Sequence, residues 1–183
     1  MCSVVMPTCN IHETAIVHPD AKIGKNVSIG PYAVIDEETV IGDGCIIGAH
    51  AVIHRYTTIG KNCRFFPGCS IGGEPQDLKF VGEKSYTFIG DGGTFRECVT
   101  VNRGCGDRAV IGGLSAVHQF CKIGRNAMIG GMARVTQDVP PFMIVAGDPA
   151  VVSGLNSVGL ARAGMAAEDR SELKKAFRIL YRS

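Results

Sequence analysis

Hydrophobic residues recur along the chain with a period of six. An apolar residue stands at every sixth position from Ile11, and a small residue follows it four positions later. The apolar series is Ile11, Val17, Ile23, Ile29, Ile35, Ile41, Ile47, Ile53, Ile59, Phe65 and Ile71, and the small series is Ala15, Ala21, Val27, Ala33, Thr39, Cys45, Ala51, Thr57, Cys63 and Cys69. Such a hexapeptide forms one face of a triangular coil of about 18 residues, and each strand pairs with the same face of the next coil. We therefore predict an all-β solenoid, a left-handed parallel β-helix with a continuous aliphatic core.

The period is interrupted first after Ile71. The register places inward aliphatic residues at positions 77 and 83, where the sequence has Asp77 and Glu83. A coil cannot continue there, so residues 72–88 are predicted to form an excursion loop, and the repeat resumes at Ile89. A loop this long on a rigid scaffold is usually functional.

A second interruption, at 102–110, changes the phase of the repeat. The inward residue after Val101 is Ile111, ten positions on, and the series then continues to Val135. We predict that the β-helix ends near Pro140-Pro141, because two missing N–H groups stop strand pairing.

This gives a β-helix over residues 1–150 and a partial C-terminal helical region over 151–183. Within that region, Ala166–Ser183 is predicted as a helix that presents one apolar face. The residues on that face are Leu173, Ala176, Phe177 and Leu180.

Composition narrows the possible partners and the location. The formal net charge is +2 with no broad basic field, so nucleic acid is not expected as a partner. No stretch approaches the roughly 18 apolar residues of a membrane span, and the start of the chain lacks a signal-peptide pattern. We expect a cytoplasmic protein without membrane insertion.

Eight cysteines raise the question of disulfides or metal, but none forms a CxxC pair. Cys45, Cys63, Cys69 and Cys121 occupy the small inward position of the repeat, which favours a structural role. We predict no metal site.

Five histidines are candidates for acid–base chemistry. His12, His18 and His54 directly follow inward residues at what we expect to be a solvated corner, and His50 is a slightly better candidate. His118 is better placed, in the run AVHQF beside Gln119 on a glycine-flanked coil. Either its imidazole hydrogen-bonds a ligand, or its hydrogen bonds are made at a contact between chains of a trimer.

Two further segments carry groups suited to binding. Gln76, Asp77 and Lys79 bring an amide, a carboxylate and an ammonium together, which can hold sugar hydroxyls and a phosphate, although a solvated loop tip has the same appearance. The basic residues of the C-terminal tail can steer an acidic partner such as acyl carrier protein towards the chain. Alternatively, they are only the solvent-exposed face of a helix.

Several strings occur together and in order: IGGEPQDLKFVGE (71–83), FRECVTVNRG (95–104), IGGLSAVHQFCKIG (111–124), QDVPPFMIVAGDPA (137–150) and GLNSVGLARAG (154–164). With them the chain resembles the acyl-carrier-protein-dependent UDP-N-acetylglucosamine O-acyltransferases of lipid A biosynthesis. The resemblance spans nearly the whole chain, and PQDLK with AVHQF separates it from other hexapeptide acyltransferases, which remain a third reading.

The resemblance implies a homotrimer with sites between subunits and transfer of a 3-hydroxyacyl group from acyl carrier protein to the sugar 3-hydroxyl of UDP-N-acetylglucosamine. It implies no cofactor. It assigns substrate contacts to Gln76, Asp77, Lys79, His118 and Gln119, nucleotide contacts to Asn156 and Arg162, and the measurement of acyl-chain length to Gly131. In the nucleotide motif, Val158 replaces a common Glu and Ala163 replaces the second of two consecutive Arg, which predicts weaker nucleotide binding.

The largest departure from the family lies at the phase break. The family carries about two further coils there, with a His-x-x-His motif whose second His is the general base, and this chain lacks them. One hypothesis is that His118 or another His replaces that base, in which case His118→Ala is expected to abolish acyl transfer. The other hypothesis is that the chain is a non-catalytic β-helix trimer that binds sugar nucleotide or only assembles. The resemblance also implies that a glycine N–H which polarises the thioester carbonyl is absent. Losing the base lowers a rate about 10²–10⁴-fold, and losing such an oxyanion donor lowers it about 10²–10³-fold. We therefore expect impaired activity.

Overall fold

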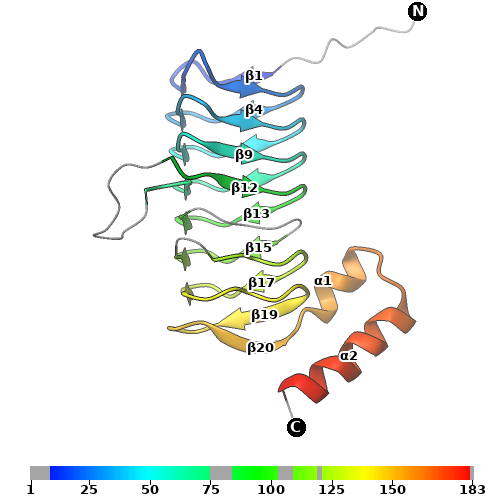
Figure 1. The fold of residues 1–183 in the computed structure, drawn as a ribbon. Coiled ribbons are helices and arrows are strands. Elements are labelled where there is room, and N and C mark those ends of the chain that lie inside the picture. The colour runs from blue at the N-terminus through cyan, green and yellow to red at the C-terminus, as the bar shows by residue number, and fades with distance from the viewer. Residues whose placement is uncertain (1–8, 75–83, 103–108, 119–120, 182–183) are drawn as a thin grey trace, which may run out of the picture.

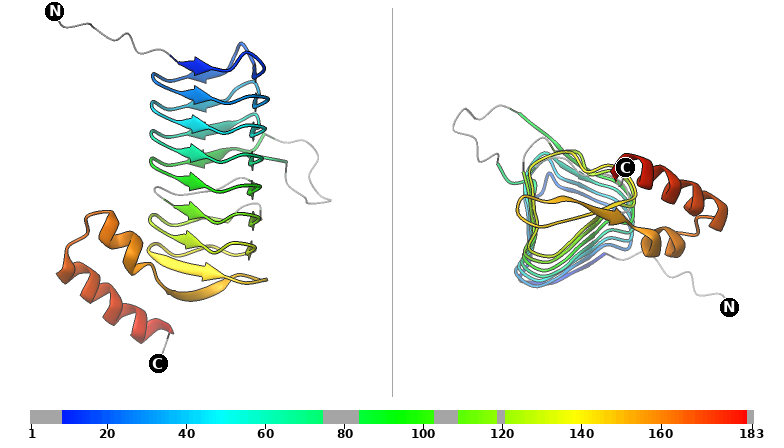
Figure 2. Two further views of the ribbon diagram at one scale, coloured as in Figure 1. Left: turned by 180° about the vertical axis from the view of Figure 1, so that it is seen from behind. Right: turned by 90° about the horizontal axis from the view of Figure 1, so that it is seen from below.

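The computed structural model describes residues 9–74, 84–102, 109–118 and 121–181. In these residues the chain winds into stacked coils, each contributing short strands to the sides of a triangular prism (Figure 1). Viewed along the prism axis in Figure 2, the coils superimpose as a triangle, and the C-terminal helices lie outside it.

Within the described residues the strands form three sheets. The first sheet contains β1 (Asn10–Ile11), β4 (Ser28–Ile29), β7 (Ile46–Ile47), β10 (Arg64–Phe65), β13 (Thr94–Phe95), β15 (Val110–Ile111), β17 (Met128–Ile129), β19 (Met143–Ala146) and β20 (Val151–Leu155). The second sheet contains β2 (Ile16–Val17), β5 (Val34–Ile35), β8 (Val52–Ile53), β11 (Ser70–Ile71), β14 (Thr100–Val101), β16 (Ala116–Val117) and β18 (Arg134–Val135). The third sheet contains β3 (Lys22–Ile23), β6 (Val40–Ile41), β9 (Thr57–Ile59) and β12 (Thr87–Ile89).

Parallel pairing puts each inward residue beside its equivalent in the next coil. Ile35 pairs with Ile53, and Ile53 with Ile71, so the aliphatic side chains form continuous columns. These side chains are almost fully buried, and the rings of Phe65 and Phe95 stack with centroids 4.7 Å apart. The predicted left-handed parallel β-helix is confirmed.

The small inward positions are filled as the repeat predicts. Cys45, Cys63, Cys69 and Cys121 are all buried. The thiol of Cys45 donates to the Gly60 carbonyl at 3.1 Å, so a cysteine here also bonds the backbone of the following coil. These four cysteines are therefore part of the core.

The excursion loop is shorter than the sequence predicted. Strand β12 begins at Thr87, inside the predicted loop 72–88, because Thr87 takes the small inward position opposite Thr57. Residues 75–83, which form the centre of this loop, lie outside the described residues.

The two sheets described on both sides of the phase break continue across it. Phe95 pairs with Ile111 and Val101 pairs with Val117, so the coil at the break has 16 residues, where the coil from Ile47 to Phe65 has 18. Residues 103–108 lie outside the described part. Beyond the break, the third side of the described prism retains only a bridge between Ile123 and Val139.

The prediction that the β-helix ends near Pro140-Pro141 is wrong. Strand β19 follows these prolines and pairs in parallel with β17, and β20 then pairs antiparallel with β19. The prolines occupy a corner, where no ladder hydrogen bond is required of them. The boundary predicted between 150 and 151 therefore falls inside a β19–β20 hairpin.

Two helices follow in the described chain, α1 (Ser157–Arg162) and α2 (Ala167–Tyr181). Phe177 is buried, but Leu180 is 70% exposed, so the predicted apolar face of the tail is only partly covered. The cause is that α2 packs against α1 and β20 rather than along the prism. Neither helix is both long and apolar enough to cross a bilayer within the described residues.

Candidate functional site

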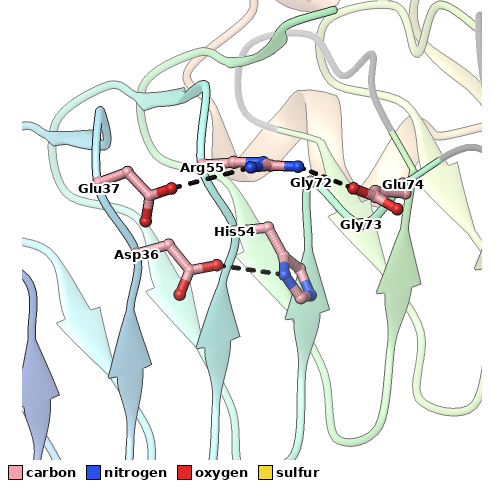
Figure 3. Close-up of a pocket in the computed structure, with 7 residues that line it drawn as sticks. All are labelled: Asp36, Glu37, His54, Arg55, Gly72, Gly73 and Glu74. Carbon is pink, nitrogen blue, oxygen red and sulfur yellow. Dashed lines mark hydrogen bonds and ion pairs between the residues drawn. The ribbon is translucent and has the colours of Figure 1, made fainter. Parts of the chain in front are cut away.

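A polar cavity of about 470 Å³ opens at the corner of the prism that follows the second sheet (Figure 3). Asp36, His54 and Gly72 come directly after β5, β8 and β11, so the strand register stacks them in one column. The cavity is lined by Asp36, Glu37, His54, Arg55, Gly72, Gly73 and Glu74.

His54 is held at both ring nitrogens. Its Nδ1 lies 3.4 Å from a carboxylate oxygen of Asp36, and its Nε2 lies 3.1 Å from the hydroxyl oxygen of Ser70. With the proton on Nδ1, facing the carboxylate, Nε2 is the acceptor. The Asp36 carboxylate thus orients the imidazole, and about a third of each of these two side chains is exposed.

Arg55 lies between two acidic side chains, as Figure 3 shows. Its guanidinium is 3.0 Å from Glu74 and 3.9 Å from Glu37. The hydrogen bond to Glu74 raises the pKa of Arg55 above its usual value. Arg55 therefore pairs with these two carboxylates, whereas Asp36 pairs with His54.

The two ends of the excursion loop are attached to the same corner of the prism, on neighbouring coils. Glu74 precedes residues 75–83 and bonds Arg55, and Lys84 follows them and bonds Glu38 at 3.3 Å. The Lys84 ammonium also lies 4.9 Å from the centre of the Tyr56 ring. The segment that carries Gln76, Asp77 and Lys79 thus leaves and rejoins the described chain beside this cavity.

A second cavity, of about 490 Å³, lies at the corner that precedes the first sheet. Its lining residues are Gly92, Val110, Asn126, Asn156, Gly159, Arg162 and Ala163. Asn156 and Arg162, the predicted nucleotide contacts, are thereby brought together. Gly92 and Val110 come from neighbouring coils on opposite sides of the phase break.

Asn156 also organises the backbone there. Its side-chain oxygen accepts the Gly159 N–H at 3.0 Å and caps α1, and its amide nitrogen donates to the Asn126 carbonyl at 2.9 Å. The helix is thus tied to the prism. Arg162 is exposed in the last turn of α1, where its guanidinium can reach solvent and ligand.

The remaining predicted residues are dispersed. His118 follows β16 in the same column as His54, is exposed, and has no side-chain partner in the described part of the chain. Gly131 is exposed at another corner, and a Cβ built there would meet the Gly113 carbonyl oxygen at an ordinary contact of 3.4 Å. Gln76, Asp77, Lys79 and Gln119 lie outside the described residues.

Sequence reasoning treated His54 as a solvated corner residue and missed its pairing with Asp36. The signal was present, because 18 residues separate the two, the length of one coil. In the described chain no three His, Cys, Asp or Glu side chains are arranged to hold a metal ion. The absence of a metal site stays a prediction.

Two family models match parts of the chain. Residues 20–55 match the model described as bacterial transferase hexapeptide (six repeats), and residues 138–183 match UDP N-acetylglucosamine O-acyltransferase, domain 2. The second match includes α1 and α2.

Similar proteins extend this match over most of the chain. The acyl-[acyl-carrier-protein]–UDP-N-acetylglucosamine O-acyltransferase of Thiobacillus denitrificans is 44% identical, over 94% of this chain and 84% of its own length. The Synechocystis protein of the same name is 43% identical over 66% of this chain, which spans 59% of that relative's length. The crystal structure of the Moraxella catarrhalis UDP-N-acetylglucosamine O-acyltransferase has a TM-score of 0.63 at 32% identity, covering 94% of this chain and 85% of that one.

The Thiobacillus alignment is longer than this chain. It runs over 217 positions, more than the 183 residues of this chain, so the relative carries residues that have no counterpart here. Identity and coverage nevertheless extend over both sides of the break. This chain belongs to the family of UDP-N-acetylglucosamine O-acyltransferases.

Proposed function

We propose that this chain is an acyltransferase of lipid A biosynthesis that moves a 3-hydroxyacyl group from acyl carrier protein to the 3-hydroxyl of UDP-N-acetylglucosamine. The observation that carries this proposal is the family membership, together with the cavity that Asn156 and Arg162 share. The cytoplasm, where both substrates of such a reaction occur, is the proposed location. The thioester itself supplies the activated acyl group, so no cofactor is proposed.

We propose that turnover is slow compared with that of full-length relatives. The chain has no His-x-x-His sequence, and the relatives contain residues that it lacks. The loss of a general base accounts for about 10²–10⁴-fold in rate. Val158 and Ala163 add weaker nucleotide binding, because neither side chain can hydrogen-bond or carry a charge.

Substrate contacts are proposed for the residues that the family motifs identify. These are Gln76, Asp77, Lys79, His118 and Gln119 for the sugar and its phosphates, Asn156 and Arg162 for the nucleotide, and Gly131 for the acyl chain. A Cβ built on Gly131 would be at ordinary contact distance from the Gly113 carbonyl oxygen, so no side chain occupies this space. This supports an acyl chain longer than one that a side chain at this position would admit.

A homotrimer is proposed on the position of the two cavities. One follows the second sheet and the other precedes the first sheet, so they open at different corners of the prism. A ligand that contacts both groups of residues is accommodated more readily between neighbouring chains than on one. Closed cyclic symmetry then repeats the same site at each interface.

Acyl carrier protein is proposed to approach α2. Lys174, Lys175 and Arg178 are exposed on this helix, although Lys175 already bonds Glu172 at 2.7 Å. Positive charge of this kind accelerates encounter with an acidic partner and loses its effect as salt increases.

The test is a turnover assay on the purified chain with a panel of acyl-carrier-protein thioesters, in which acylated UDP-N-acetylglucosamine is quantified by mass spectrometry. We expect product above the enzyme-free background, most of it from one chain length. Absence of product with every donor would overturn the proposal.

The alternative function is a non-catalytic trimer that binds sugar nucleotide, and the absent His-x-x-His sequence favours it. Calorimetric binding of UDP-N-acetylglucosamine without any turnover would support this alternative. Turnover above background would exclude it.

A further inference from the structure

The described part of the chain offers one imidazole that is both oriented by a carboxylate and open to a cavity. We propose that His54, positioned by Asp36, is the general base of acyl transfer in this chain, and that the acceptor hydroxyl binds over the bare α-carbon of Gly73. This inference rests on the proposed function and replaces His118 as the substitute for the family's missing base.

The contacts of His54 fit this role. Asp36 faces Nδ1 at 3.4 Å and favours the tautomer in which Nε2 accepts a proton. The Ser70 hydroxyl lies 3.1 Å from Nε2 and holds the ring in place. A bound hydroxyl takes over this contact, since one acceptor nitrogen serves one strong donor at a time.

The space in front of Nε2 exists because residue 73 has no side chain. A Cβ built on Gly73 would lie 4.0 Å from His54 Nε2 and 2.9 Å from the Asn102 side-chain oxygen. Any side chain at residue 73 would therefore crowd the Asn102 oxygen and stand beside the His54 ring, and the glycine keeps this face of the imidazole open. A hydroxyl that binds above residue 73, closer to the ring than this Cβ position, can donate to Nε2.

The carboxylates around the cavity outnumber the cationic side chains. Three carboxylates line the cavity, on Asp36, Glu37 and Glu74, against the single guanidinium of Arg55. Arg55 is paired with Glu37 and Glu74, so its positive charge is offset. The imidazolium formed on proton abstraction is therefore stabilised by Asp36.

The step is a single displacement. Nε2 of His54 takes the proton of the acceptor hydroxyl while that oxygen attacks the thioester carbonyl carbon. A C–O bond forms, the C–S bond breaks, and the departing thiolate takes the proton back from His54. An ester and a free thiol result, and His54 returns to its neutral form.

His118 lacks these features. It is exposed, and no carboxylate of the described chain contacts its ring. His18 is the better control, because it stands in the same column of the prism and has a carboxylate partner, Asp20, at 3.8 Å, but does not line the cavity.

The test compares turnover of the unaltered chain with that of four variants: His54→Asn, Asp36→Asn, Gly73→Ala and His18→Asn. We expect His54→Asn to lower kcat about 10²-fold or more. Asp36→Asn lowers kcat while KM for the sugar nucleotide stays unchanged. Gly73→Ala fills the space over residue 73 and lowers kcat/KM, whereas His18→Asn behaves as the unaltered chain.

A structural defect is separated from a catalytic one by chemical rescue. His54→Ala should regain turnover when imidazole is added, which a misfolded protein cannot do. Thermal unfolding followed by circular dichroism checks that each variant retains the fold.

The outcomes separate this inference from the proposed function. An unaltered chain without turnover overturns both. Normal turnover in His54→Asn, or its loss in His118→Asn alone, overturns the inference and leaves the proposed function standing. An acyl adduct on Ser70 in the intact-mass spectrum, with inactivity of Ser70→Ala, also overturns it, because the serine would then be the nucleophile.

Discussion

At the residue scale, aspartates bond the backbone of adjacent coils at the corners. Asp43 accepts the Lys25 N–H at 2.9 Å, and Asp138 accepts the Lys122 N–H at 2.8 Å. Each carboxylate satisfies a turn N–H of the preceding coil, which the strand ladder leaves unpaired. The hexapeptide pattern predicts the inward residues of the prism, but these corner bonds depend on polar residues that follow no strict period.

Asp43 should therefore contribute to a pH dependence of stability. The backbone bond from Lys25, helped by the nearby Lys61 ammonium, lowers the pKa of Asp43. A lowered folded-state pKa means that the stabilisation is present at neutral pH and is lost as the pH falls below about 4. Melting temperatures measured by calorimetry between neutral and acid pH should fall less steeply for Asp43→Asn than for the unaltered chain. Equal slopes would show that Asp43 does not contribute.

The buried cysteines should resist alkylation in the native state. Burial raises the pKa of Cys69 to about 11 and raises that of Cys121, so both remain thiols at neutral pH. Since the thiolate is the nucleophile, they are both protonated and shielded.

Iodoacetamide labelling with peptide mass spectrometry checks this prediction. Exposed Cys9 and Cys98 serve as internal positive controls and should react without denaturant. Modification of Cys69 at a similar rate would contradict the core packing described for it.

At the element scale, period-six positions predicted the strands well, and the exceptions have physical causes. The prolines at 140 and 141 suggested an end to pairing, but they lie in a corner and β19 follows them. The apolar spacing that includes Leu180 predicted a buried face of the C-terminal helix. In the structure α2 contacts α1 and β20, and Leu180 remains exposed. Patterns within an element do not reveal which neighbour will cover it.

Helix α1 should depend on Asn156. Replacing a capping Asn by Ala costs about 0.5–2 kcal/mol, and Asn156→Ala also removes the bond to the Asn126 carbonyl. We expect a lower free energy of unfolding in urea and faster amide exchange in α1. Ser157→Ala, at the neighbouring exposed position, is the matched control. If α1 exchanges at the same rate in both variants, the cap does not hold the helix.

At the scale of the whole molecule, stability should be spread along the prism and decrease at its ends. Each coil contacts its immediate neighbours, so the total is close to a sum over coils and interfaces. Ile53 is fully buried between Ile35 and Ile71, whereas Ile11 is 44% exposed and, within the described residues, pairs on one side only, with Ile29. The solenoid and its phase break were readable from sequence, whereas the His54 cavity required knowing which residues share a column.

Paired substitutions measure this gradient. Ile53→Ala should lower the free energy of unfolding by about 2–5 kcal/mol, because it creates a cavity between two packed coils. Ile11→Ala should have a much smaller effect, since its side chain already meets solvent. Chemical denaturation of both variants provides the comparison, and equal losses would argue against a sum over coils.

Because strand pairing continues across the phase break, the distance between two sites along the prism axis is set by the number of coils between them. Strands in neighbouring coils lie about 4.8 Å apart, and Phe95 pairs with Ile111 as regularly as Ile47 pairs with Phe65. Adding or removing one coil therefore shifts everything beyond it along the axis by about the same increment. The axial separation between the cavity lined by His54 and the cavity lined by Asn156 and Arg162 therefore changes by one such increment for each coil added or removed.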